Sequence, residues 1–275
     1  METNEGTGGP VMSLRKLHDP SQGPMKVVGF MSGSGTNIRK IVEHQKRLEK
    51  AMGSSPFVVV ALFSDRAESN APLIGKEFDI PVVIRDLQGF CKRRGVSRRD
   101  MGAREEFDRE TVRALSPFGA KVAAFGGYMS IATAPIMEAF LAVNVHPADL
   151  SIEREDGRRR FTGDHAVRDA ILAGEKYLRA STHIVEPLVD EGRLLMISPP
   201  VEVVLLDTWD LKREEDLLKA ESLNQERLKE RGDWVVFPRT IEDIALGKFA
   251  QDEDGNLYYS GTPIPKGLKL EEETP

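Results

Sequence analysis

The sequence is poor in cysteine and in long apolar runs, and each shortage excludes a class of protein. Cys91 is the only cysteine among 275 residues, so one chain forms no disulfide framework and no thiolate metal cluster. No apolar run approaches the roughly 20 residues that a membrane helix requires. Residues 1–24 are polar and lack the apolar core of a signal peptide. We therefore expect a cytoplasmic protein that does not enter a membrane.

Excess positive charge and metal-ligand spacing are missing as well. Lysine and arginine number 38 against 44 aspartate and glutamate residues, which gives a net charge of −6. A nucleic-acid footprint usually needs a basic face, so this balance favours small-molecule substrates and argues against nucleic acid. The five histidines show no pattern such as His-Glu-x-x-His, so we expect no metal site. The sequence gives no indication of the oligomeric state.

What the sequence does contain is an alternation of short apolar runs with stretches of helical periodicity. Strand-like runs occupy residues 26–31, 57–63, 81–84, 122–125 and the run that ends in Asn144 and His146. Helical stretches separate them, and two charged helices are expected at 211–230 and 233–246. This alternation predicts an α/β fold, a twisted and mostly parallel sheet with helices on both faces.

The same pattern suggests a division of the chain into three parts. Residues 1–24 are expected to be a flexible N-terminal extension, because ordered periodicity begins only afterwards. Residues 25–260 are expected to form a single domain, and residues 261–275 a C-terminal tail.

A glycine-rich turn follows the first predicted strand and opens the first predicted helix. It contains Gly33, Ser34, Gly35, Thr36 and Asn37. Free backbone N–H groups and the helix dipole at such a turn favour a phosphate, which the glycines allow to approach closely. A third glycine and a Walker lysine are absent, so a monophosphate fits better than a dinucleotide. The alternative is a tight turn in which Ser34 or Thr36 simply caps the helix.

The pair Asn144 and His146 combines a neutral amide and an imidazole two positions apart at the end of an apolar run. Alternate side chains of a strand share one face, so both project into the same site. Pro147 disfavours a helix beginning at His146, which places the pair at the end of a strand. Ligands of open α/β sheets bind at such ends, although a lone histidine there is often structural.

In their order along the chain, these motifs resemble those of the glycinamide ribonucleotide formyltransferase family. The family's Ser-Gly-x-Gly-Ser/Thr-Asn turn stands at 32–37, its Asn-x-His-Pro step at 144–147 and its Asp-Gly-rich loop at 189–192. His183 precedes Asp190 by seven residues, as in the family. Residues 126–129 (Gly-Gly-Tyr-Met) are similar to the family's Ala-Gly-Phe-Met strand end.

The resemblance implies folate-dependent transfer of a formyl group from 10-formyltetrahydrofolate to the amine of glycinamide ribonucleotide, in purine biosynthesis. Asn144 and His146 would stabilise the oxyanion of the tetrahedral intermediate. Asp190 would raise the pKa of His146 and help a water molecule to move the proton. Folate contacts would come from Tyr128, Met129 and Ile131, and the resemblance implies no metal.

Several positions depart from the family or allow two interpretations. The family arginine after Phe-Met is Ser130 here, Pro187 interrupts the loop before Asp190, and a charged insert fills 151–160. We expect the arginines of that insert to be solvated and His183 to be structural. Asp233 stands where the family contacts the substrate amine, or else begins a solvated helix.

Three other functions stay open at this stage. The chain is compatible with a related formyltransferase that uses a different amine acceptor, and with a nucleotide-binding protein that has lost catalysis. A hydrolase that releases formate from the same folate is the third, although it normally carries a regulatory domain ahead of the catalytic one.

Overall fold

The apolar runs form one eight-stranded sheet in the computed structural model of the protein, which describes residues 13–271. The strand order is β14-β9-β8-β6-β5-β2-β3-β4. All neighbours are parallel except at β8, which is antiparallel to both β6 and β9. The strands are β2 (Met25–Met31), β3 (Phe57–Ser64), β4 (Val82–Ile84), β5 (Val122–Phe125), β6 (Leu141–His146), β8 (Ser181–Ile184), β9 (Leu194–Ile197) and β14 (Leu268–Lys269). The predicted mostly parallel sheet is confirmed.

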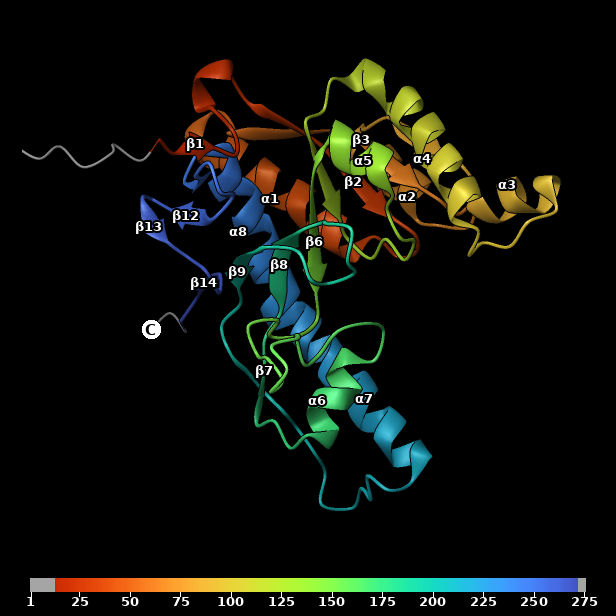
Figure 1. Ribbon diagram of the computed structural model, residues 1–275, viewed down its shortest axis with the longest axis vertical. Helices are drawn as coiled ribbons and strands as arrows, with labels where there is room; N and C mark the ends of the chain where they lie inside the picture. Colours follow the sequence, from red (N-terminus) through yellow and green to blue (C-terminus); the bar gives the residue numbers. More distant parts are fainter. Residues whose placement is uncertain (1–12, 272–275) are drawn as a thin grey trace, which may run out of the picture.

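Helices cover both faces of this sheet, as predicted (Figure 1). One face carries α1 (Thr36–Met52), α2 (Ala71–Phe78) and α8 (Trp234–Ala245). The other carries α3 (Leu87–Arg94), α4 (Met101–Leu115) and α5 (Ala134–Ala139).

Strand β2 shows why two separate cores form. Met25, Val27 and Met31 enter the core on the α1 side, whereas Val28 and Phe30 enter the core on the α4 side. Alternate side chains of a strand point to opposite faces, so a strand that is apolar throughout must be covered twice.

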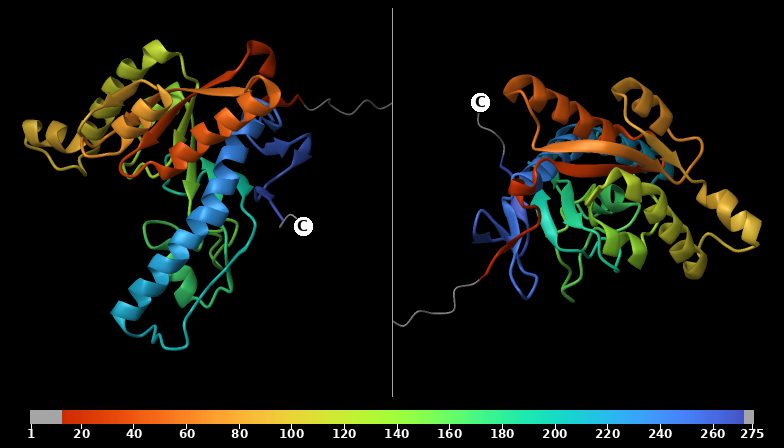
Figure 2. Two further views of the ribbon diagram at one scale, coloured as in Figure 1. Left: turned by 180° about the vertical axis from the view of Figure 1, so that it is seen from behind. Right: turned by 90° about the horizontal axis from the view of Figure 1, so that it is seen from above.

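A smaller lobe projects from the carboxyl edge of the sheet (Figures 1 and 2). It contains α6 (Ala166–Leu172), α7 (Glu214–Leu228) and a two-stranded ribbon of β7 (Tyr177–Leu178) and β10 (Val201–Glu202). Helix α7 continues through a π-helical turn, η3 (Lys229–Asp233), into α8, so the two predicted helices form one rod. The apolar residues 194–204 form two separate strands, β9 (Leu194–Ile197) and β10.

Both ends of the described chain are more ordered than expected. A four-stranded sheet joins β1 (Arg15–Lys16), β11 (Phe249–Gln251), β12 (Leu257–Tyr259) and β13 (Thr262–Pro263), and a 3-10 turn, η1 (Pro20–Gln22), follows β1. A second 3-10 turn, η2 (Ser116–Phe118), follows α4 in the middle of the chain. β14, from the expected tail, forms an edge of the central sheet beside β9. The boundaries at 24 and 260 therefore need correction, because two-residue strands leave no periodic signal in a sequence. Residues 1–12 and 272–275 lie outside the described part.

No helix between residues 13 and 271 is both long and apolar enough to cross a membrane.

The contribution of β14 can be measured by comparing chains that end at residue 271 and at residue 265. β14 supplies ladder bonds to β9, and the Leu270 carbonyl accepts from Arg179 Nη1 at 3.1 Å. We expect the shorter chain to lose roughly 1–3 kcal/mol of unfolding free energy in urea. Equal urea midpoints for the two chains would contradict this role.

Candidate active site

Strand β6 carries Asn144 and His146 to the carboxyl edge of the sheet, so the prediction that the pair stands at a strand end is confirmed. Asn144 lies opposite His183 of β8, and the Asn144 Nδ2 to His183 Nε2 distance is 3.2 Å. His183 Nδ1 donates to the Ile184 carbonyl at 2.9 Å, so in the neutral ring Nε2 accepts from the amide. The amide of Asn144 keeps a second N–H for another acceptor.

Asp190 comes back to this face on the loop between β8 and β9. Its Oδ2 lies 3.5 Å from His146 Nδ1, and its Oδ1 lies 3.7 Å from His183 Nε2. The backbone amide of Gly163 donates to Oδ2 at 2.9 Å. The structure thus brings Asn144, His146 and Asp190 together and adds His183 to the cluster. Pro187 does not keep the loop from reaching His146.

The electrostatics of the cluster differ from the expectation for His146. Burial by itself raises the pKa of Asp190, but contact with His183, the charge of His146 and the Gly163 amide hold that pKa at about 2. For His146, burial outweighs the nearby carboxylate and lowers the pKa. The expected rise of the His146 pKa is therefore wrong in this conformation, in which the side chain of His146 is 7% exposed.

The charged segment at 151–160 is part of the site rather than a solvated loop. Arg159 donates to the backbone carbonyls of Asp190 and Gly192, whereas Arg158 is 80% exposed, as expected. Directly after the insert, the Phe161 carbonyl accepts a hydrogen bond from His146 Nε2 at 3.0 Å. The solvated interpretation is wrong for Arg159, because the hairpin folds back over the Asp190 loop.

The glycine-rich turn leaves the first turn of α1 uncapped by any side chain. Gly35 is the N-cap residue, in the left-handed region with φ 67°, and a Cβ there would lie 2.2 Å from Met31 Cε. Gly33 and Ser34 are exposed. Capping by Ser34 or Thr36 is therefore wrong, and the backbone N–H groups at this helix end are available to an anion.

The turn lies at the switch point of the sheet, where β2 has β3 on one side and β5 on the other. A buried carboxylate, Asp65 at the end of β3, joins the loops there. It accepts from Ser32 Oγ at 2.6 Å and from Ser130 Oγ. The Met129 amide donates to Ser32 Oγ at 2.9 Å. Sequence reasoning missed Asp65, and Ser130, which replaces the family arginine, is used for this internal contact.

The three expected folate contacts separate into two groups. Tyr128 packs edge-on against Phe30 and Phe125, and burial raises its pKa, so its side chain belongs to the core. Met129 is 58% exposed and Ile131 is 48% exposed. Of the three, only Met129 and Ile131 offer an apolar side chain to a ligand.

Asp233 is buried at the start of α8 instead of being solvated. Its Oδ2 accepts from Asn37 Nδ2 at 3.1 Å, whereas its Oδ1 and Asn37 Oδ1 have no hydrogen-bond partner. Burial raises the pKa of Asp233 to about 7, although the Asn37 contact opposes the shift. Two unpartnered buried oxygens beside the glycine-rich turn mark a place for hydrogen-bond donors.

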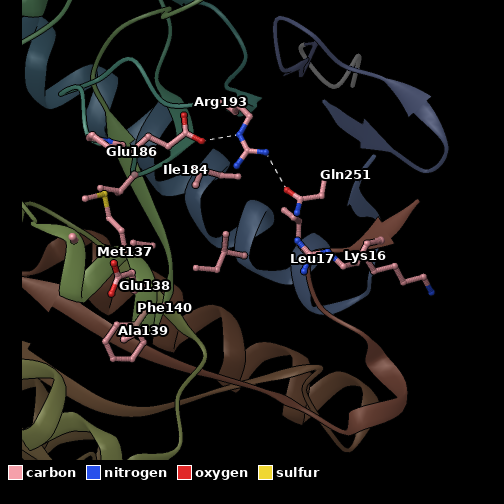
Figure 3. A pocket seen from close by; sticks show the side chains of 16 residues that line it. Lys16, Leu17, Met137, Glu138, Ala139, Phe140, Ile184, Glu186, Arg193 and Gln251 are labelled. Carbon is pink, nitrogen blue, oxygen red and sulfur yellow. Dashed lines mark hydrogen bonds and ion pairs between the residues drawn. The ribbon is translucent and has the colours of Figure 1, made fainter. Parts of the chain in front are cut away.

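A cavity of about 640 Å³ lies at the amino end of β6, away from Asn144 and His146 (Figure 3). Met137, Phe140 and Ile184 contribute apolar walls, and Arg193 bridges Glu186 and Gln251 there. None of the predicted site residues lines this cavity.

Comparison with known proteins shows the family of the chain. A sequence model of the formyl transferase family matches residues 25–215. The chain belongs to this family. Phosphoribosylglycinamide formyltransferase of Mycobacterium tuberculosis (strain ATCC 25618 / H37Rv) is 28% identical over 214 residues, which cover 77% of this chain and 85% of that protein.

The chain is also similar to a multifunctional protein and to a solved structure. The trifunctional purine biosynthetic protein adenosine-3 of Drosophila melanogaster is 26% identical over 230 residues, which are 82% of this chain and 14% of that protein. The crystal structure of phosphoribosylglycinamide formyltransferase from Anaplasma phagocytophilum shares the fold, with a TM-score of 0.65 and 23% identity. The match covers 91% of this chain and 100% of that one.

Within residues 13–271 of this formyl transferase family member, no group of three or more His, Cys, Asp or Glu side chains is arranged to hold a metal ion.

The buried acid of the site predicts a pH-dependent stability. The folded chain keeps Asp233 protonated up to pH about 7, whereas the unfolded chain releases this proton near its ordinary pKa of 3.8. The contribution of Asp233 to stability is therefore present below about pH 4 and is lost as pH rises to about 7. We expect Asp233→Asn, which retains an acceptor for Asn37, to raise the unfolding free energy at pH 8 by about 2–4 kcal/mol.

Urea unfolding at pH 4 and pH 8 checks this prediction. The matched control is Glu253→Gln at an exposed position, which should leave both values unchanged. An Asp233→Asn variant whose stability at pH 8 equals that of the parent would show that the acid carries no penalty.

Proposed function

We propose that the chain transfers a formyl group from 10-formyltetrahydrofolate to the amine of glycinamide ribonucleotide, and that one domain carries the whole site. The observation that carries the proposal is the convergence of Asn144, His146 and Asp190 at the carboxyl edge of the sheet. The formyl donor is inferred from the family, and the acceptor is inferred from the names of the relatives. The cytoplasm stays the predicted location.

The acceptor's phosphate is assigned to the turn formed by Gly33, Ser34, Gly35, Thr36 and Asn37. The uncapped N–H groups of α1 supply hydrogen bonds and the positive end of a helix dipole. Asn37 connects this turn to Asp233, whose free oxygen can accept from the amine or a hydroxyl of the same substrate. Phosphate and amine would then be held by two ends of one polar surface.

The chemistry begins when the amine nitrogen attacks the formyl carbon and forms a tetrahedral oxyanion. The free N–H of Asn144 can donate to that oxygen. Asp190 is ionised at neutral pH, so it can orient a water molecule that takes the proton from the attacking nitrogen. The bond from the formyl carbon to N10 of the folate then breaks, and N10 receives a proton.

His146 is held in one orientation by the Phe161 carbonyl and Asp190. A second ring proton, taken up from solvent, would give the imidazolium an acceptor at each nitrogen, and its positive charge then lies beside the negative charge that develops on the oxyanion. Its role is to stabilise the oxyanion, at a pKa that burial keeps low in the resting protein.

Folate recognition is assigned to the loop after β5. Met129 and Ile131 expose apolar side chains on which a flat ring can pack. Tyr128 contributes only its backbone, because its ring is in the core.

The proposal is tested by incubating the purified protein with 10-formyltetrahydrofolate and glycinamide ribonucleotide and following formylated product. We expect Asp190→Asn or His146→Ala to lower kcat by roughly 10²- to 10⁴-fold, since each removes proton transfer or oxyanion stabilisation. The control is His165→Ala, whose 70% exposed side chain lies outside the cluster.

The outcomes of this assay separate the alternatives. Transfer to another amine alone indicates a different acceptor, and formate release without an acceptor indicates a hydrolase. Binding of nucleotides without turnover of folate indicates a protein that has lost catalysis.

The phosphate assignment has its own test in Ser34→Asp. Residue 34 is exposed, so the added carboxylate should leave the fold intact while it repels a phosphate. We expect the KM for the phosphorylated amine to rise roughly tenfold or more, about 1.4 kcal/mol, with kcat little changed. The same KM in Ser34→Asp and in the Ser34→Asn control would place the phosphate elsewhere.

A further inference from the structure

We propose that Arg159 is a positioning residue for formyl transfer, which holds the loop carrying Asp190 by bridging the backbone carbonyls of Asp190 and Gly192. The inference rests on the proposed function, because the loop matters for catalysis only if Asp190 does.

The tip of the Asp190 loop is not held by apolar packing. Its tip exposes Leu188 by 72% and Val189 by 57%, so it gains little from apolar burial. The backbone of Asp190 is in the left-handed region, with φ 56°. This region is less favourable than the right-handed one for a residue with a side chain. A free loop would relax and carry the carboxylate away from His146.

Arg159 has the shape and the placement to prevent this. Its side chain is 12% exposed, and its Nη2 donates to the Gly192 carbonyl at 2.6 Å while Nη1 donates to the Asp190 carbonyl. The two acceptors lie on either side of Glu191, whose carboxylate is 3.8 Å from Arg159 Nε. A planar guanidinium has separate nitrogen donors that reach both carbonyls at once. A lysine has only one nitrogen, so it cannot hold both carbonyls with the same rigidity.

The segment that carries Arg159 is itself anchored on both sides. Glu153 and Arg159 form a β-bridge, the Arg160 amide donates to the Ile152 carbonyl at 2.9 Å, and Lys266 Nζ lies 3.1 Å from Glu153. Immediately afterwards, Phe161 contacts His146 and Gly163 contacts Asp190. One stretch of chain therefore aligns both members of the His146 and Asp190 pair.

Kinetics test the proposal with Arg159→Lys and Arg159→Ala, and with Arg158→Ala as the matched control. A shifted Asp190 loop should lower kcat by roughly 10- to 100-fold in Arg159→Ala and less in Arg159→Lys. The KM for the phosphorylated amine should not change, because the glycine-rich turn is untouched. Arg158→Ala should behave as the parent.

A double-mutant cycle shows whether Arg159 acts through Asp190. If it does, Arg159→Ala in an Asp190→Asn background lowers kcat no further than Asp190→Asn alone. Losses that multiply, or an Arg159→Ala variant with the parent kcat, would overturn the proposal.

Hydrogen exchange separates this inference from the proposed function. The Gly163 amide donates to the Asp190 carboxylate, so its exchange reports the position of the loop without any turnover. Arg159→Ala should speed exchange at Gly163 and at Glu191, whereas Arg158→Ala should not. Faster exchange in a protein without formyl transfer would retain the positioning and reject the function; unchanged exchange would reject the positioning.

Discussion

The buried carboxylate of Asp190 is the constraint on which the candidate site depends. A carboxylate that is taken out of water needs compensation, and here the Gly163 amide donates to it while His146 on β6 and His183 on β8 lie 3.5 and 3.7 Å away. Antiparallel pairing of β8 with β6 places the two imidazoles on one face, and the loop between β8 and β9 folds over them. The sheet thereby assembles an ionised acid beside a buried histidine at neutral pH.

The second half of the site shows the opposite electrostatic solution. Asp233 has a single donor, Asn37, and its pKa rises instead of falling. At Asp233 burial outweighs the single Asn37 contact, whereas at Asp190 the His183 contact, the charge of His146 and the Gly163 amide outweigh burial. Groups that are left incompletely satisfied weaken the fold and are retained where a substrate can complete them. The Asp65 carboxylate has a structural role, because Ser32 and Ser130 both donate hydrogen bonds to it.

A large part of the fold was predictable because its signals are local. The valine-rich run at Phe57–Ser64 predicts a strand, and the glycines before α1 predict a turn. The Asn-x-His-Pro step predicts the end of a strand. Short strands such as β1 and β14 were not predictable, since two residues show no periodicity. Tyr128 was misplaced for a related reason: strand-end position does not tell whether a ring turns to the core or to the ligand.

The sequence by itself determined the order of elements, the sheet type, the glycine-rich turn and the pair Asn144 and His146, because these depend on residues close together in the chain. The tertiary structure alone decided that Arg159 bridges the Asp190 loop, that Asp233 is buried against Asn37 and that the pKa of His146 is lowered. Those outcomes depend on burial and on partners 30 to almost 200 residues away. Solvation and charge pairing act through space, so the local pattern of a sequence carries no signal for them.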